Sequence, residues 1–92
     1  MAETRIRRRY VFSGLVQGVG FRYRARHAAE LYGVSGWVHN DLSGTVTMEL
    51  QGGAAAIEAV LEAIERGRYV RVEDVSVRSL PLVAEERGFV VR

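Results

Sequence analysis

Residues 14–22 have the sequence GLVQGVGFR and lie between a strand-like run, residues 10–12, and a helix-like run, residues 21–32. A glycine-rich turn that joins a strand to a helix leaves backbone N–H groups free, and the N-terminal end of the helix dipole adds positive potential there. Arg22 adds a guanidinium at the start of the same helix. Loops of this kind bind tetrahedral anions, most often phosphate. The stretch therefore predicts a phosphate site between the first strand and the first helix.

The two common nucleotide-binding loops do not fit this stretch. The Gly-Lys-Ser/Thr sequence of a nucleotide-triphosphate loop is absent. The dinucleotide fingerprint also fails, because Tyr23 stands where its third glycine is needed after Gly18 and Gly20.

Hydrophobic periodicity and turn residues on either side of the loop predict the remaining elements. Residues 1–5 are expected to be a frayed terminus, and a bulge is expected at Glu73-Asp74, where the apolar alternation shifts by one. The expected strands are residues 6–14, 34–40, 45–51, a fourth from 70 and a last short one at 88–91, and the expected helices are residues 21–32 and 54–66. This order predicts an α+β fold in which two helices cover one face of an antiparallel sheet.

Alternation along the third strand assigns its two faces. Val46, Met48 and Leu50 should point to the helices, whereas Thr45, Thr47, Glu49 and Gln51 should point outward.

The same order predicts that Arg22 and Asn40 meet. The first strand ends at the loop that carries Arg22, and the first helix then runs back along the sheet. The second strand returns and finishes at Asn40, so both residues should lie at the same end of the sheet.

Two segments together resemble the acylphosphatase family, and the similarity runs through nearly the whole chain. They are residues 14–22 and residues 36–40, GWVHN, which are followed by SGTV at 43–46. The resemblance implies a ferredoxin-like βαββαβ sandwich, here with a short extra C-terminal strand, and a small stand-alone enzyme that hydrolyses carboxyl-phosphate anhydrides. It implies that Arg22 and Asn40 are catalytic. It also implies that the substrate phosphate is held by the backbone of Gln17, Gly18, Val19, Gly20, Phe21 and Arg22.

The chemistry of an acyl phosphate suits these residue types. The carboxylate leaving group has a conjugate acid with a pKa of about 4, so it leaves without a proton and needs no general acid. Arg22 offers a planar fork of donors for phosphate oxygens. Asn40 can orient a water molecule but cannot act as a base. With only Asp41 and Asp74 as aspartates, we expect no metal and no cofactor.

Composition limits the classes of protein to which the chain can belong. At 92 residues it is one domain, 1–92, with no cysteine and a net charge of +2. All 13 basic residues are arginine, so lysine Schiff-base chemistry is excluded. No apolar run is long enough to span a membrane. We expect a cytoplasmic monomer that acts on a small acyl phosphate and binds neither nucleic acid nor membranes.

Other interpretations stay open on the residues alone. A detached acylphosphatase-like domain of a hydrogenase maturation protein is disfavoured, because those proteins are much longer and carry cysteine-rich zinc modules. A non-catalytic phosphate- or RNA-binding ferredoxin-like module remains as the alternative. Against RNA, the outward residues of the third strand include no aromatic side chain, and Glu49 would repel phosphate.

Overall fold

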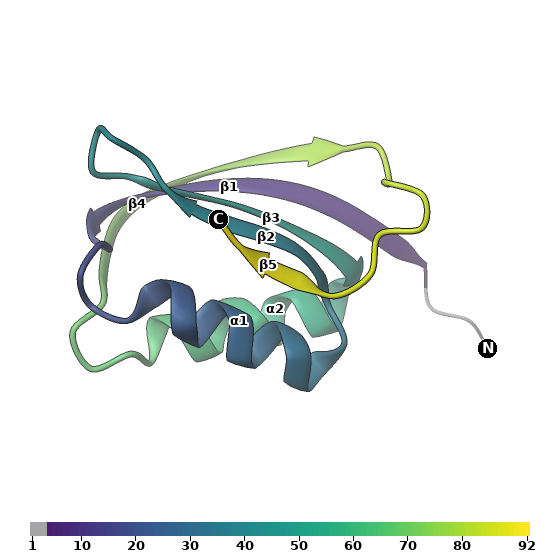
Figure 1. Ribbon diagram of the computed structural model, residues 1–92, viewed down its shortest axis with the longest axis horizontal. Coiled ribbons are helices and arrows are strands. Elements are labelled where there is room, and N and C mark those ends of the chain that lie inside the picture. The colour runs from purple at the N-terminus through teal and green to yellow at the C-terminus, as the bar shows by residue number, and fades with distance from the viewer. Residues whose placement is uncertain (1–3) are drawn as a thin grey trace.

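The computed structural model describes residues 4–92 and contains the expected succession of elements (Figure 1). In chain order these are β1 (Arg5–Leu15), α1 (Phe21–Tyr32), β2 (Ser35–Asn40), β3 (Val46–Gly53), α2 (Ala54–Glu65), β4 (Arg71–Leu80) and β5 (Phe89–Val91). The predicted frayed terminus is wrong at Arg5, which already belongs to β1, and residues 1–3 lie outside the described part of the chain.

The strands form one sheet in the order β4-β1-β3-β2-β5. The pairs among β1 to β4 are antiparallel, as predicted, whereas the short β5 runs parallel to β2. β5 can run parallel to β2 because residues 81–88 carry the chain from β4, at one edge of the sheet, to β5 at the other edge (Figure 1). The sheet is therefore mixed, with an antiparallel four-stranded centre and one parallel addition.

Both helices pack on one face of the sheet and enclose the apolar core (Figure 1). The inward assignment of Val46, Met48 and Leu50 is confirmed, since all three are fully buried. The remaining core side chains come mainly from β1, α1 and α2: Tyr10, Phe12, Phe21, Ala25, Ala28, Ala29, Ile57, Val60 and Ile64.

On the opposite face of the sheet the outward assignment is correct, but part of this face is buried. Glu49 and Gln51 point away from the helices, yet these two residues are only 6% and 1% exposed. Residues 81–88 fold back over them: the Gln51 side chain bonds to both backbone groups of Val83, at 3.0 and 2.8 Å. Alternation identified the correct face, but it could not show that a distant connection covers that face.

A buried ionic cluster fills the space beneath this connection. Arg7 lies 2.7 Å from a Glu49 carboxylate oxygen and 2.8 Å from Glu86, and Arg9 lies 2.6 Å from the other Glu49 oxygen. Burial alone would raise the pKa of Glu49, but hydrogen bonds from Arg9 and Arg7 and their positive charges lower that pKa below its ordinary value. The connection is thus held to the sheet by paired charges.

The predicted bulge is confirmed, and it shapes the end of β1. Ser13 pairs with Asp74 and Gly14 pairs with Val72, which leaves Glu73 as the extra residue. Gly14 has a φ of 118°, and a Cβ there would lie 2.4 Å from the backbone oxygen of Arg71. Only glycine fits this contact, so the bulge bends β1 where it enters the glycine-rich loop.

Candidate active site

A small hollow of about 150 Å³ lies where the β1–α1 loop meets the end of β2. Arg22 and Asn40 both line it, although 18 positions separate them in the sequence. Gly18 and Gly20 supply the backbone wall from the loop. The topology therefore brings together the residues that the sequence predicted to meet.

The loop conformation depends on its two glycines. Gly18 and Gly20 have φ values of 71° and 80°, in the left-handed region that other residues rarely adopt. Gly20 is also the N-cap of α1, and no side chain within residues 4–92 caps that helix end. The first turn of α1 therefore presents its backbone N–H groups at the hollow, where the helix dipole favours an anion.

Gln17 anchors the loop to the β2–β3 turn through its side chain. Its Nε2 donates to the backbone oxygens of Asp41 and Thr45, at 2.7 and 2.9 Å. The Asp41 carboxylate in turn accepts 2.7 Å hydrogen bonds from the hydroxyls of Thr45 and Thr47. The sequence predicted a contribution from the Gln17 N–H; it gave no sign that the side-chain amide ties the loop to the turn that follows Asn40.

Arg22 lies half-buried in the second position of the first turn of α1. Its Nη1 donates to the backbone oxygen of Arg92 at 3.2 Å. This bond holds one arm of the guanidinium against the chain beyond β5. Among the described residues it is the sole hydrogen bond of the Arg22 side chain, so the rest of the donor fork remains available to a ligand.

Asn40 is the last residue of β2, and its side chain reaches the hollow. Its Oδ1 atom is buried, yet it accepts no hydrogen bond from any described residue. A buried acceptor without a partner is costly, so it is uncommon unless a water or ligand occupies the site. His39 is exposed and does not line the hollow, in agreement with strand alternation.

The six predicted loop residues do not all reach the hollow. Gly18, Gly20, Phe21 and Arg22 line it, whereas Gln17 and Val19 do not. Val19 packs against the core, and Phe21 is buried with its ring 5.0 Å from that of Phe12. Tyr23 lines the hollow as well and was missed at the sequence level. Nothing in the pattern of α1 distinguished it from an ordinary exposed helix residue.

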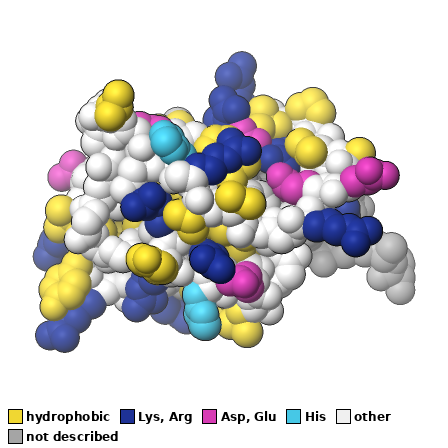
Figure 2. All heavy atoms as spheres, in the orientation of Figure 1, with side chains coloured by type: hydrophobic (Ala, Val, Ile, Leu, Met, Phe, Trp, Pro, Cys, Tyr) yellow, Lys and Arg dark blue, Asp and Glu magenta, His cyan; other side chains and the backbone are white. Residues whose placement is uncertain are grey.

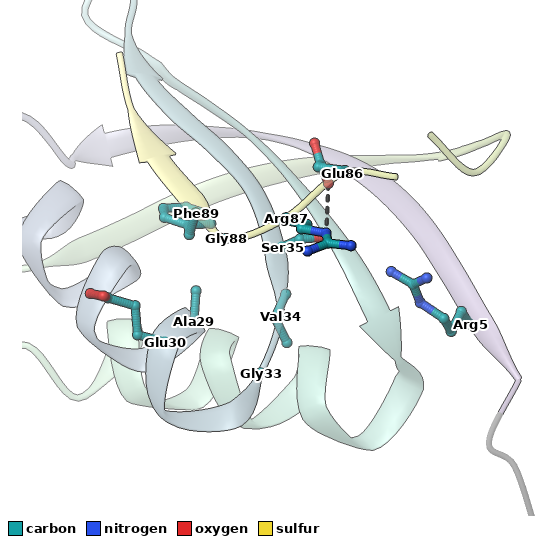
Figure 3. Close-up of a pocket in the computed structure, with 10 residues that line it drawn as sticks. All are labelled: Arg5, Ala29, Glu30, Gly33, Val34, Ser35, Glu86, Arg87, Gly88 and Phe89. Atoms are coloured by element: carbon teal, nitrogen blue, oxygen red, sulfur yellow. Dashed lines mark hydrogen bonds between the residues drawn. The ribbon is translucent and has the colours of Figure 1, made fainter. Parts of the chain in front are cut away.

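A larger hollow of about 430 Å³ lies at the other end of β2, beside Val34 and Ser35 (Figure 3). Its buried polar side chain, Ser35, is already engaged: it donates to Glu86 at 2.8 Å (Figure 3). Glu86 also accepts from Arg7. We do not assign the chemistry to it, because it lacks unpaired buried acceptors and is far from Arg22 and Asn40 along β2.

Within residues 4–92 no cluster of His, Cys, Asp or Glu is arranged to hold a metal ion. No helix there is long and apolar enough to cross a membrane.

Comparisons with known proteins agree on one family. A family model described as Acylphosphatase matches residues 8–91. The chain is 43% identical to the acylphosphatase of Bifidobacterium longum over 89 residues, which cover 95% of this chain and 92% of that relative. The crystal structure of acylphosphatase from Bacillus subtilis superposes with a TM-score of 0.85 at 31% identity, covering 95% of this chain and 98% of that one. Full-length HypF, in a phosphate- and nucleotide-bound form, matches with a TM-score of 0.87 at 29% identity, but only 12% of its chain is covered.

Proposed function

The chain belongs to the acylphosphatase family and hydrolyses the carboxyl-phosphate bond of acyl phosphates, and we propose that this reaction takes place in the hollow between Arg22 and Asn40. The observation that carries the proposal is the buried, partnerless Oδ1 of Asn40 beside a loop of free backbone donors.

The phosphoryl group is held by the β1–α1 loop and by Arg22. Backbone N–H groups around Gly18 and Gly20 and the first turn of α1 donate to its oxygens, in the manner of other helix N-termini that bind anions. The free arm of the Arg22 guanidinium completes the shell and stabilises the negative charge that is spread over the oxygens in the transition state.

The attacking water is positioned by Asn40. The amide oxygen accepts a hydrogen bond from the water and so satisfies the buried acceptor, and this orients an oxygen lone pair toward phosphorus. Asn40 does not remove the proton, because an amide is no base. Positioning and electrostatic stabilisation supply most of the catalysis in phosphoryl transfer, so a site that orients the water and binds the phosphoryl group needs no catalytic base.

The leaving carboxylate needs no proton, and the proposed mechanism needs no metal ion or cofactor. We expect full activity in excess chelator. We propose that the enzyme acts as a monomer in the cytoplasm, without a nucleic-acid partner, and size-exclusion chromatography at assay concentration tests the first part.

An RNA-binding platform finds little support on the sheet. The sheet face that such modules use is covered in part by residues 81–88, which bond to Gln51 and, through Glu86, to Arg7. On the face in Figure 2, basic and acidic side chains are both spread over the surface.

The test is hydrolysis of benzoyl phosphate in water enriched in oxygen-18, in the presence of excess chelator. Attack of an oriented water on phosphorus places the label in inorganic phosphate and leaves the benzoate unlabelled. Label in the benzoate would show attack at the carbonyl carbon and would contradict the role proposed for Asn40. Loss of turnover in chelator would contradict the metal-free site.

A further inference from the structure

Beside the 150 Å³ hollow that Arg22 and Asn40 line, which we call the first hollow, lies another of about 230 Å³, which we call the second hollow. The second hollow is lined by Arg22, Tyr23, Arg26 and Val91. Arg22 and Tyr23 are walls of both hollows, so the two spaces meet along this part of α1. A phosphoryl group that is bound in the first hollow therefore leaves the second one open to the group attached to it.

The walls of this second hollow are amphipathic. Tyr23 is 79% exposed and offers an aromatic ring that the protein itself does not bury. Val91, in β5, adds an apolar wall, and Arg26 adds a positive charge. Methylene groups can therefore pack beside Tyr23 and Val91 while a negative group approaches Arg26.

Helix geometry sets the distance between the two charges. Arg22 and Arg26 are four residues apart on α1, so they lie on the same face and about 6 Å apart along the helix axis. That separation suits a short acyl chain with a phosphate at one end and a carboxylate at the other.

Arg26 is only weakly engaged within the protein. Its Nε lies 3.5 Å from Glu30 Oε1, and the two side chains are 55% and 60% exposed. Exposed pairs of this kind are weak and screened by salt, so an anionic ligand can compete for the guanidinium. The Glu30 carboxylate opposes such a ligand, but it does not line the hollow, whereas Arg26 does.

We propose that this second hollow receives the acyl half of the substrate and that Arg26 favours acyl phosphates whose acyl group ends in a second negative charge. The proposal rests on the proposed function, because it places the phosphoryl group at Arg22. It makes Arg26 a specificity-determining residue that touches the substrate far from the bond that breaks.

The test compares succinyl phosphate with butyryl phosphate, which has the same chain length but no terminal carboxylate. The ratio of their kcat/KM values is expected to fall about fivefold in Arg26→Gln, the size expected for one exposed ion pair. Glu30→Gln should raise the ratio, because it removes the competing carboxylate. High salt should move the wild-type ratio toward that of Arg26→Gln.

Arg66→Gln is the matched control. Arg66, directly after the last residue of α2, lies 3.8 Å from Glu62 in another exposed pair four residues apart. Arg66→Gln changes the net charge as much as Arg26→Gln does, but Arg66 does not line the second hollow. The ratio of kcat/KM values in Arg66→Gln should therefore stay at that of the wild type. An unchanged ratio in Arg26→Gln, with both compounds hydrolysed, would overturn this inference and leave the proposed function standing. A wild-type protein that hydrolyses neither compound would overturn both.

Discussion

The two ends of β2 each border a hollow, and the smaller of the two carries the chemistry. At the Ser35 end the hollow measures about 430 Å³, but Ser35 and Glu86 already bond to each other (Figure 3). Glu86 also bonds to Arg7. At the Asn40 end it measures about 150 Å³, and it holds a buried acceptor that no described residue satisfies. A buried acceptor that the fold leaves unpaired therefore marks the site better than volume does.

This contrast separates function from stability along one strand. Changes at the Asn40 end should reduce activity with little loss of stability. Changes to the ionic cluster near the Ser35 end should reduce stability with little effect on the chemistry. The predictions below test this separation, beginning with the largest expected effect.

Arg22→Ala should reduce kcat/KM for benzoyl phosphate by about 10²–10³-fold, because it removes a charged donor to the transition state. Arg87→Ala is the matched change at the other end, since Arg87 is an exposed arginine that lines the larger hollow. We expect its kcat/KM to stay within about twofold of wild type, the effect of a surface substitution. Steady-state kinetics on both variants measures these values. Comparable losses of kcat/KM in the two variants would show that the chemistry is not confined to the hollow at the Asn40 end.

Glu49→Gln should lower the free energy of unfolding by about 3 kcal/mol, because it removes the buried carboxylate that pairs with Arg7 and Arg9 and leaves the buried Arg7 with Glu86 alone. Urea denaturation measures the loss, and benzoyl phosphate turnover by the folded variant should remain near that of wild type. A variant as stable as the wild type would show that the cluster adds nothing beyond the packing of residues 81–88.

The same carboxylate predicts how stability depends on pH. The pKa of Glu49 is lowered in the folded protein, so its contribution is present above the unfolded-state value of about 4.3 and is lost as the pH falls through the folded value. Wild type should therefore lose stability between neutral pH and pH 3 more steeply than Glu49→Gln. Parallel curves for the two proteins would contradict the lowered pKa.

Gln17→Ala should have a smaller effect, and it should reduce both stability and activity. It removes two hydrogen bonds to half-exposed backbone oxygens that water can replace, so we expect a loss of about 1 kcal/mol in unfolding free energy. The loop then loses its tie to the β2–β3 turn, and kcat should fall by about tenfold because the phosphate and Asn40 are less well aligned. Unaltered kcat, measured with saturating substrate, would show that the glycine conformations alone fix the loop.

Local sequence signals predicted the elements and the meeting of Arg22 with Asn40. Glycines at the ends of β1 and α1, and the turn after Asn40, mark chain reversals, and reversals determine which strand ends lie together. The bulge at Glu73 was predictable because a shift in apolar alternation is visible in the chain itself.

The features that escaped prediction depend on contacts between distant segments. Glu49 and Gln51 look exposed until residues 81–88 fold over them. The Gln17 amide bonds to carbonyls 24 and 28 residues away, and Tyr23 and Val91 share a hollow only because β5 lies beside α1. Such contacts leave no periodic trace in the sequence.

The most direct test of the central claim separates binding from turnover in Asn40→Ala. Inorganic phosphate affinity is measured by its competitive inhibition of any residual activity and by its effect on melting temperature, and kcat is measured with benzoyl phosphate. We expect phosphate affinity within about threefold of wild type and a kcat lowered by at least about 100-fold, because Arg22 and the loop hold phosphate while Asn40 orients the water. A folded Asn40→Ala enzyme that turns over at nearly the wild-type rate would contradict the account.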